Sequence, residues 1–270
     1  MKVEEIVVPF TEDFKRPARN GTIVFCAASF NTWVESVLPI VQEIKPTSLK
    51  VFTHARDVGK YKFYVAKFPK LEKYYPYPFS TKPSTRRAKL TLNGNPTTHC
   101  AFDGEINIPI LSTERGEPWM SLTPNEVLTQ AKLVKVAKGD VGIAGMGLGW
   151  LAQRVLMQPR VTSVTVYDIE LDVLKFFRDQ VDAVAKQVGK RVRFVHANAY
   201  EVDWMKHDQS LWDIWMDVNG GSDDYRFWKI CNELRQAGKS CHGWYTVKPT
   251  QWCVNMMKRR EKELQDAAGV

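Results

Sequence analysis

The chain has 270 residues, of which 44% are hydrophobic and 25% charged, and this composition excludes a wholly disordered protein. The formal net charge of +8 leaves nucleic acid open as a partner, although a mildly basic protein without a phosphate-bearing partner would have the same charge. No run approaches the roughly 20 apolar residues of a membrane span, and the first residues lack the apolar core of a signal peptide.

The five cysteines are expected to form neither a disulfide framework nor a zinc cluster, because their number is odd and no C-x-x-C occurs. The histidines His196, His207 and His242 are too scattered for metal-ligand spacing, so we expect no metal site. These observations fit a reducing compartment. We therefore expect a cytoplasmic protein that does not contact a membrane, and a homo-oligomer is left open.

Residues 1–115 are expected to form a small mixed α/β region. Residues 22–28 form an apolar run typical of a buried strand, and residues 31–44 have apolar side chains at helical spacing. Residues 48–54 are expected to form another strand. Residues 56–89 are rich in lysine, tyrosine and proline, and the stretch from Tyr74 to Phe79 within them is expected to form an irregular, packed connection.

A β-hairpin is expected at the end of this region. Asn93-Gly94 follows a strand-like run that begins at Lys89, and an Asn-Gly pair in this position is the strongest short-range hairpin signal. The return strand is expected over residues 98–102. A further short strand is expected over residues 106–111.

A helix is expected next, from Thr123 to about Lys138. Thr123 can cap the helix, Pro124 fits its first position, and Glu126 completes a capping box. This helix would belong to the second domain, which is expected over residues 116–270.

The second domain is expected to have a Rossmann-like fold, because strand-like and helix-like segments alternate along it. Such alternation builds a mostly parallel sheet with helices on both faces. The expected strands are residues 140–144, 161–167, 192–196, 212–216 and 240–247, and the expected helices are residues 149–157, 170–188, 224–237 and 250–267.

A glycine-rich loop separates the first strand of this domain from its helix. Gly145, Gly147 and Gly149 allow the sharp turn and the close backbone approach that a nucleoside ligand requires. Asp168 ends the second strand, where an acid can accept hydrogen bonds from two ribose hydroxyls. A glycine turn followed by a surface aspartate with no ligand is the structural alternative.

The register of the loop separates two ligand classes. The dinucleotide fingerprint G-x-G-x-x-A can be read from Gly147, but its first glycine then lies beyond the end of the strand. The register G-x-G-x-G that begins at Gly145 fits the strand better. This second register favours S-adenosylmethionine over a dinucleotide.

The segments 141–149 and 161–170 resemble motif I and the second strand of class I S-adenosylmethionine-dependent methyltransferases, and in particular the spermidine synthase-like branch. The resemblance covers roughly residues 90–250. It implies that the three loop glycines line the cofactor tail and that Asp168 binds the ribose. The cofactor site implied by the resemblance consists of Gly145, Met146, Gly147, Gly149, Asp168, Ile169, Asn198 and Ala199.

Two further positions take their expected roles from this resemblance. Asn198 stands where the family has an acid that reaches the adenine amine, and an asparagine oxygen can accept the same hydrogen bond. A turn residue is the alternative for Asn198. Asp217 closes the expected fourth strand, and the resemblance makes it the catalytic candidate that orients or deprotonates an acceptor. The alternative for Asp217 is a cap of the following turn, which begins at Asn219.

The expected reaction is methyl transfer to a nitrogen or oxygen of a small-molecule acceptor. Aminopropyl transfer from decarboxylated S-adenosylmethionine is the enzymatic alternative. It is disfavoured because Met146, Leu148 and Trp150 stand where aminopropyltransferases have a more acidic loop. A third hypothesis is a non-catalytic domain that uses this fold to bind protein or nucleic acid. The acceptor itself cannot be deduced from the sequence.

Overall fold

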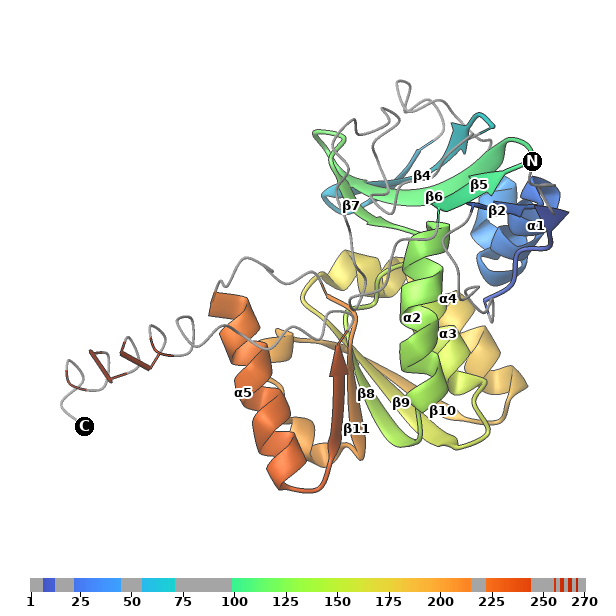
Figure 1. Cartoon of the computed structure of the whole chain (residues 1–270). Coiled ribbons are helices and arrows are strands. Elements are labelled where there is room, and N and C mark those ends of the chain that lie inside the picture. The colour runs from blue at the N-terminus through green and yellow to red at the C-terminus, as the bar shows by residue number, and fades with distance from the viewer. Residues whose placement is uncertain are drawn as a thin grey trace. The chain divides into compact units, whose positions relative to one another are not determined.

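The computed structural model describes residues 7–12, 22–44, 55–70, 99–214 and 222–243, and six single positions between residues 255 and 266 (Figure 1). The chain divides into two compact units, Met1–Ala131 and Lys132–Val270. The division lies within helix α2 (Pro124–Val136). The sequence-based border between residues 115 and 116 stays a prediction.

The first sheet of the N-terminal unit is parallel. Its strand order is β1-β2-β5, with β1 at Val7–Val8, β2 at Thr22–Phe25 and β5 at His99–Phe102. The expected return strand over residues 98–102 is thus β5, and it pairs in parallel with β2. The expected hairpin at Asn93-Gly94 and the expected strand over residues 48–54 lie outside the described residues.

The expected boundaries around the first helix were wrong. Strand β2 ends at Phe25 instead of residue 28, and α1 (Ala27–Val37) begins four residues earlier than expected. The carboxylate of Asp103 accepts a hydrogen bond from the Ala27 amide at 2.7 Å and so satisfies a free donor at the helix start. A partner 76 residues away is invisible to local sequence patterns.

The helix also ends earlier than its apolar spacing predicted. Pro39 opens a short 3₁₀ helix, η1 (Pro39–Glu43), in place of a continued α-helix. Proline lacks the amide hydrogen that an α-helix requires and disfavours the helical conformation of the residue before it, Leu38.

The second sheet of the N-terminal unit contains two strands that the sequence did not predict. Residues 56–68 form two paired antiparallel strands, and most side chains of β4 are buried. A tight turn with Gly59 at a φ of 59° joins these strands. The sheet has the order β3-β4-β6-β7, and its strands are Arg56–Val58, Tyr61–Phe68, Ile106–Thr113 and Pro118–Ser121. The irregular connection expected from Tyr74 to Phe79 lies outside the described residues.

The cap predicted for α2 is confirmed. The Thr123 hydroxyl oxygen accepts a hydrogen bond from the Glu126 amide at 3.3 Å, and the helix begins at Pro124. The Glu126 carboxylate accepts a hydrogen bond from the Ser121 hydroxyl at 3.0 Å. This bond ties the first turn of the helix to the end of β7.

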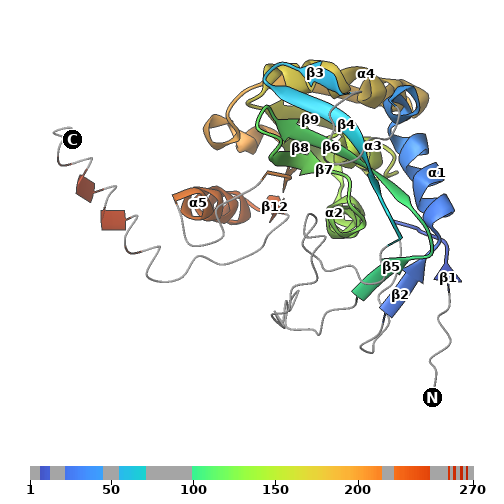
Figure 2. The ribbon, with the colours of Figure 1, turned by 90° about the horizontal axis from the view of Figure 1, so that it is seen from above.

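The C-terminal unit has the predicted Rossmann-like α/β fold. A five-stranded parallel sheet has the order β10-β9-β8-β11-β12, and helices flank it (Figures 1 and 2). The strands are β8 (Gly139–Ala144), β9 (Val161–Asp168), β10 (Arg191–His196), β11 (Gln209–Trp212) and β12 (Ser240–Gly243). The helices are α3 (Trp150–Leu156), α4 (Leu171–Gln187) and α5 (Ser222–Gln236), with short 3₁₀ helices η2 (Ala199–Glu201) and η3 (Trp204–Lys206).

The fourth strand lies earlier in the chain than expected. It spans Gln209–Trp212, whereas the sequence predicted residues 212–216. Gln209 and Ser210 are polar and were therefore not predicted to lie in a strand, yet both are buried. The Gln209 side chain accepts a hydrogen bond from the Lys138 amide and donates one to the Val136 carbonyl, so its burial leaves no polar group unsatisfied.

A disulfide contradicts the expectation of unpaired cysteines. Cys231 in α5 is bonded to Cys241 in β12. The premise of a reducing compartment therefore fails for this pair, and the cytoplasmic location stays a prediction. Within the described part of the chain, no helix is long and apolar enough to cross a membrane.

The disulfide should contribute measurably to stability. It closes a loop of ten residues, and loop-closure entropy predicts about 2–3 kcal/mol for a loop of this size. We expect dithiothreitol to lower the melting temperature of the wild-type protein. A double Cys231→Ala, Cys241→Ala variant should melt at a temperature that dithiothreitol does not change. An equal response of both proteins to dithiothreitol would contradict the prediction.

Candidate functional site

The glycine loop lies between β8 and α3, as the sequence predicted. Gly145, Gly147 and Gly149 have φ angles of 93°, 52° and 80°, which are left-handed conformations that favour glycine. A Cβ atom on Gly145 would lie 2.5 Å from the carbonyl oxygen of Asp213, so the loop has no room for a side chain there. The loop therefore approaches the end of β11 more closely than any other residue type allows.

The residues next to the glycines anchor the loop. Met146, Leu148 and Trp150 are all buried. The Gly149 amide donates a hydrogen bond to the Met146 carbonyl at 2.9 Å, which closes a tight turn. The side chain of Met146, which was expected in the cofactor site, is thus packed in the interior.

Asp168 connects the loop to the second strand. Its Oδ2 accepts a hydrogen bond from the Met146 amide at 2.7 Å, and its Oδ1 accepts one from the Glu170 amide at 2.8 Å. Burial raises the pKa of Asp168, while these two amides lower it, and the pKa lies above its usual value overall. Each carboxylate oxygen retains a lone pair that can accept a hydroxyl hydrogen bond.

The residue after this acid presents an apolar surface. Ile169 is 57% exposed, which is the highest value among the exposed large hydrophobic side chains described in this unit. Its carbonyl accepts a hydrogen bond from Nε2 of His196 at 2.9 Å. The position of Ile169 is therefore held by the end of β10, and its side chain is available for contact with an apolar ring.

The end of β10 lies beside Asp168, because the Ala197 amide donates a hydrogen bond to the Asp168 carbonyl at 3.0 Å. Asn198 follows and caps η2, since its Oδ1 accepts a hydrogen bond from the Tyr200 amide at 3.1 Å. Its Nδ2 donates to Glu201 at 2.9 Å. The turn role left open by the sequence is therefore present. Contact of Asn198 or the buried Ala199 with adenine stays a prediction.

The catalytic candidate Asp217 lies outside the described residues. Sequence reasoning passed over another acid, Asp213, which directly follows the observed end of β11 and is buried. The Asp213 amide donates a hydrogen bond to the Ala144 carbonyl at 2.8 Å, and its own carbonyl faces Gly145. An expected strand that ended at Trp212 would have made Asp213 the acid at its carboxyl end.

The expected site residues that the structure describes thus gather at one place, the carboxyl ends of β8, β9 and β10. In open α/β sheets this edge is where ligands bind. The loop supplies close backbone approach, Asp168 supplies acceptors, and Ile169 supplies apolar surface. This combination suits a ligand with a ribose and an aromatic base.

Comparison with known proteins gives limited similarity. No family model matches the chain, and no curated protein matches it. Two methyltransferase structures align with parts of the chain. The S-adenosylmethionine-dependent methyltransferase from Thiobacillus denitrificans in complex with S-adenosyl-L-homocysteine is 20% identical over 31% of this chain and 35% of that protein, with a TM-score of 0.25. A S-adenosylmethionine-dependent methyltransferase from Clostridium acetobutylicum is 13% identical over 40% of this chain and 43% of that protein, with a TM-score of 0.27.

A dehydrogenase-type structure aligns equally well. The Δ1-pyrroline-2-carboxylate reductase from Thermococcus litoralis in complex with NADH and L-proline is 22% identical over 40% of this chain and 36% of that protein, with a TM-score of 0.26. The chain thus spans less than half the length of each of these proteins. Similarities at these TM-scores carry no functional argument, so the assignment of a ligand rests on the site itself.

Proposed function

We propose that the protein is an S-adenosylmethionine-dependent transferase, and that it transfers a methyl group to a nitrogen or oxygen atom of a small-molecule acceptor. The observation that carries the proposal is the junction of β8, the glycine loop and Asp168. The first glycine directly follows the last residue of β8, Ala144, and has no room for a Cβ atom. This register is the one that favours S-adenosylmethionine over a dinucleotide.

Each part of the site would have its own role in binding the cofactor and the acceptor. The loop from Gly145 to Gly149 would contact the amino-acid end of the cofactor, and Asp168 would accept hydrogen bonds from its ribose. Ile169 would pack against the adenine. S-adenosylmethionine supplies an electrophilic methyl group when bound, so the protein would accelerate the reaction mainly by positioning the acceptor. Asp213 and Asp217 are the two acids proposed to orient that acceptor.

Binding of the cofactor should depend on Asp168. We expect Asp168→Ala to weaken binding of S-adenosylmethionine by about 10- to 100-fold, because charge-assisted hydrogen bonds contribute about 1.5–3 kcal/mol. Isothermal titration calorimetry measures the affinity. Asp179→Ala is the matched control, since Asp179 is an exposed acid in α4 and lies outside the site. This control should bind as the wild type does.

A second ligand separates ribose recognition from damage to the loop, because Asp168 also holds the Met146 amide. The wild type should bind S-adenosylhomocysteine more tightly than its 2′-deoxy analogue, and Asp168→Ala should bind both equally. A wild-type protein with no affinity for S-adenosylmethionine or S-adenosylhomocysteine would refute the proposal. Tighter binding of NADH, or of decarboxylated S-adenosylmethionine, would instead support a dehydrogenase or an aminopropyltransferase.

Turnover distinguishes an enzyme from a non-catalytic binding domain. In the enzyme, Asp213→Asn or Asp217→Asn should leave cofactor affinity within about threefold and reduce methyl transfer. A binding domain for nucleic acid would be insensitive to both changes, and its affinity would fall steeply with salt.

A further inference from the structure

A pocket of about 370 Å³ lies on the sheet of the C-terminal unit, and no residue of the glycine loop lines it. Thr165 and Tyr167 of β9 and Arg193 and Val195 of β10 line it. The following segment contributes Ala197, Glu201, Val202, Asp203, Lys206 and His207. Because successive residues of a strand point to opposite faces, Tyr167 and Asp168 face different sides of the sheet. None of the residues expected to bind S-adenosylmethionine lines this pocket.

One buried polar side-chain atom of the described lining lacks a partner. Thr165 is 1% exposed, and its hydroxyl oxygen has no hydrogen-bond partner in the described part of the chain. A buried hydroxyl without a partner costs about 1–3 kcal/mol. A ligand that accepts a hydrogen bond from Thr165 would remove this cost.

A cation stands directly beside that hydroxyl. Arg193 pairs with Thr165 across the two parallel strands, so both side chains lie on the same face. The Arg193 side chain is exposed, and it forms no hydrogen bond or ion pair with any residue that the structure describes. Arg193 and Thr165 together therefore offer adjacent donors to an anionic group.

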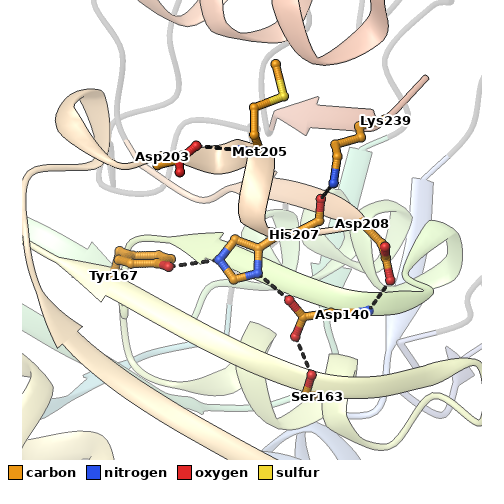
Figure 3. A network of polar contacts seen from close by, with 8 residues as sticks. All are labelled: Asp140, Ser163, Tyr167, Asp203, Met205, His207, Asp208 and Lys239. Atoms are coloured by element: carbon orange, nitrogen blue, oxygen red, sulfur yellow. Dashed lines mark hydrogen bonds and ion pairs between the residues drawn. The ribbon is translucent and has the colours of Figure 1, made fainter. Parts of the chain in front are cut away.

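The other charged groups of the pocket have partners. Asp203 accepts a hydrogen bond from the Met205 amide at 3.1 Å and forms an ion pair with Lys206 at 3.5 Å (Figure 3 shows the first of these contacts). Glu201 accepts a hydrogen bond from Asn198 at 2.9 Å. Among the described residues of the lining, Arg193 is thus the charged side chain that forms no hydrogen bond or ion pair, although its charge also attracts the Asp140 carboxylate.

Tyr167 contributes a fixed apolar wall. Its hydroxyl lies 2.8 Å from Nε2 of His207, whose Nδ1 lies 2.6 Å from Oδ2 of Asp140 (Figure 3). With Nδ1 donating to the carboxylate, Nε2 accepts the phenolic proton, so this proton is not available to a ligand. Gly142 makes the arrangement possible, because a Cβ atom there would lie 2.7 Å from the His207 ring.

The remaining lining residues are apolar. Val195, Ala197 and Val202 line the pocket together with the Tyr167 ring. Beside the paired charges of Glu201, Asp203 and Lys206, the pocket therefore combines an apolar part with a pair of donors at Arg193 and Thr165. This arrangement matches a molecule with an apolar body and a single anionic end.

We propose that this pocket binds a small organic acid, with its carboxylate between Arg193 and Thr165 and its hydrocarbon part on Val195, Ala197 and Val202. The proposal is independent of the S-adenosylmethionine site. It adds a second ligand site to the same sheet, with a separate set of lining residues.

Sodium hexanoate is a suitable probe, and NMR titration of the ¹⁵N-labelled full chain measures its binding. We expect saturable shifts at Val195 and Ala197, and binding of hexanamide at least tenfold weaker. Affinity should rise by about fourfold for each methylene from butanoate to hexanoate, because one buried methylene contributes about 0.8 kcal/mol. Equal binding of hexanoate and hexanamide, or of butanoate and hexanoate, would overturn the proposal.

Two variants locate the carboxylate. Arg193→Gln should weaken hexanoate binding at least tenfold, whereas Arg191→Gln should change it less than twofold, since Arg191 lies on the same face of β10 but outside the pocket. Thr165→Val should weaken binding about threefold or more without lowering the melting temperature, because it removes an unpartnered hydroxyl. Equal effects of the two arginine variants, or unchanged binding by Thr165→Val, would contradict the assignment.

Discussion

Gly145→Ala should lower the free energy of unfolding by about 3 kcal/mol or more and abolish binding of S-adenosylmethionine. Two costs add at this position. A left-handed conformation costs a non-glycine residue about 1–2 kcal/mol. The added Cβ would also lie 2.5 Å from the Asp213 carbonyl oxygen and 2.9 Å from Cγ2 of Ile214, and such overpacking costs about 1–3 kcal/mol. Urea denaturation measures the change in stability.

Gly189→Ala provides a matched control for Gly145→Ala. Gly189 has a φ of 67°, and a Cβ there would meet no atom within 4 Å. The free energy of unfolding of this variant should therefore fall only by the cost of the left-handed conformation, which is about 1–2 kcal/mol. It should bind S-adenosylmethionine as the wild type does, because Gly189 follows α4 and is remote from the loop. Equal destabilisation by the two changes would show that the close approach of Gly145 to Asp213 does not limit the loop.

His207→Ala should lower the free energy of unfolding by about 3 kcal/mol. The change removes the hydrogen bonds from His207 to Tyr167 and Asp140, and it leaves the buried Tyr167 hydroxyl without this partner. It also opens a cavity above Gly142. Tyr167→Phe is the graded control, since it removes one hydroxyl and keeps the contact between His207 and Asp140. Its cost should be about 1 kcal/mol, and a larger cost than that of His207→Ala would contradict the geometry.

The effect of His207→Ala should depend on pH. Burial raises the pKa of Asp140, but hydrogen bonds from Ser163 and His207 and the positive charge of Arg193 outweigh this effect, so the pKa lies below its usual value. An acid with a lowered pKa stabilises the folded state above its unfolded value of about 3.9, and this contribution is lost as the pH falls through the folded pKa. The stability difference between wild type and variant should therefore shrink below about pH 4. Chemical denaturation at pH 7 and pH 3 tests this.

Much of the C-terminal unit could be predicted from the sequence, because local sequence patterns indicate the order of its strands and helices. The alternation of strands and helices, the positive-φ glycines of the loop and the acid at the end of β9 all depend on residues close together in the chain. Helix α4 differs from its predicted range by one residue at each end, since its apolar spacing is regular. The position of Asp168 beside the loop followed from the same unit of strand, loop, helix and strand.

The sequence by itself thus determined the fold class of the C-terminal unit, the loop register and the cap at Thr123. Only the tertiary structure decided where β11 begins, what starts α1, and which cysteines pair. Gln209, Asp103 and Cys231 take their roles from partners that are distant in the sequence or buried by packing. The pocket beside Thr165 was hidden for the same reason, since its lining comes from two adjacent strands and a following segment. Local sequence patterns reflect the conformation that each residue prefers, whereas a site on the face of a sheet depends on which strands lie side by side.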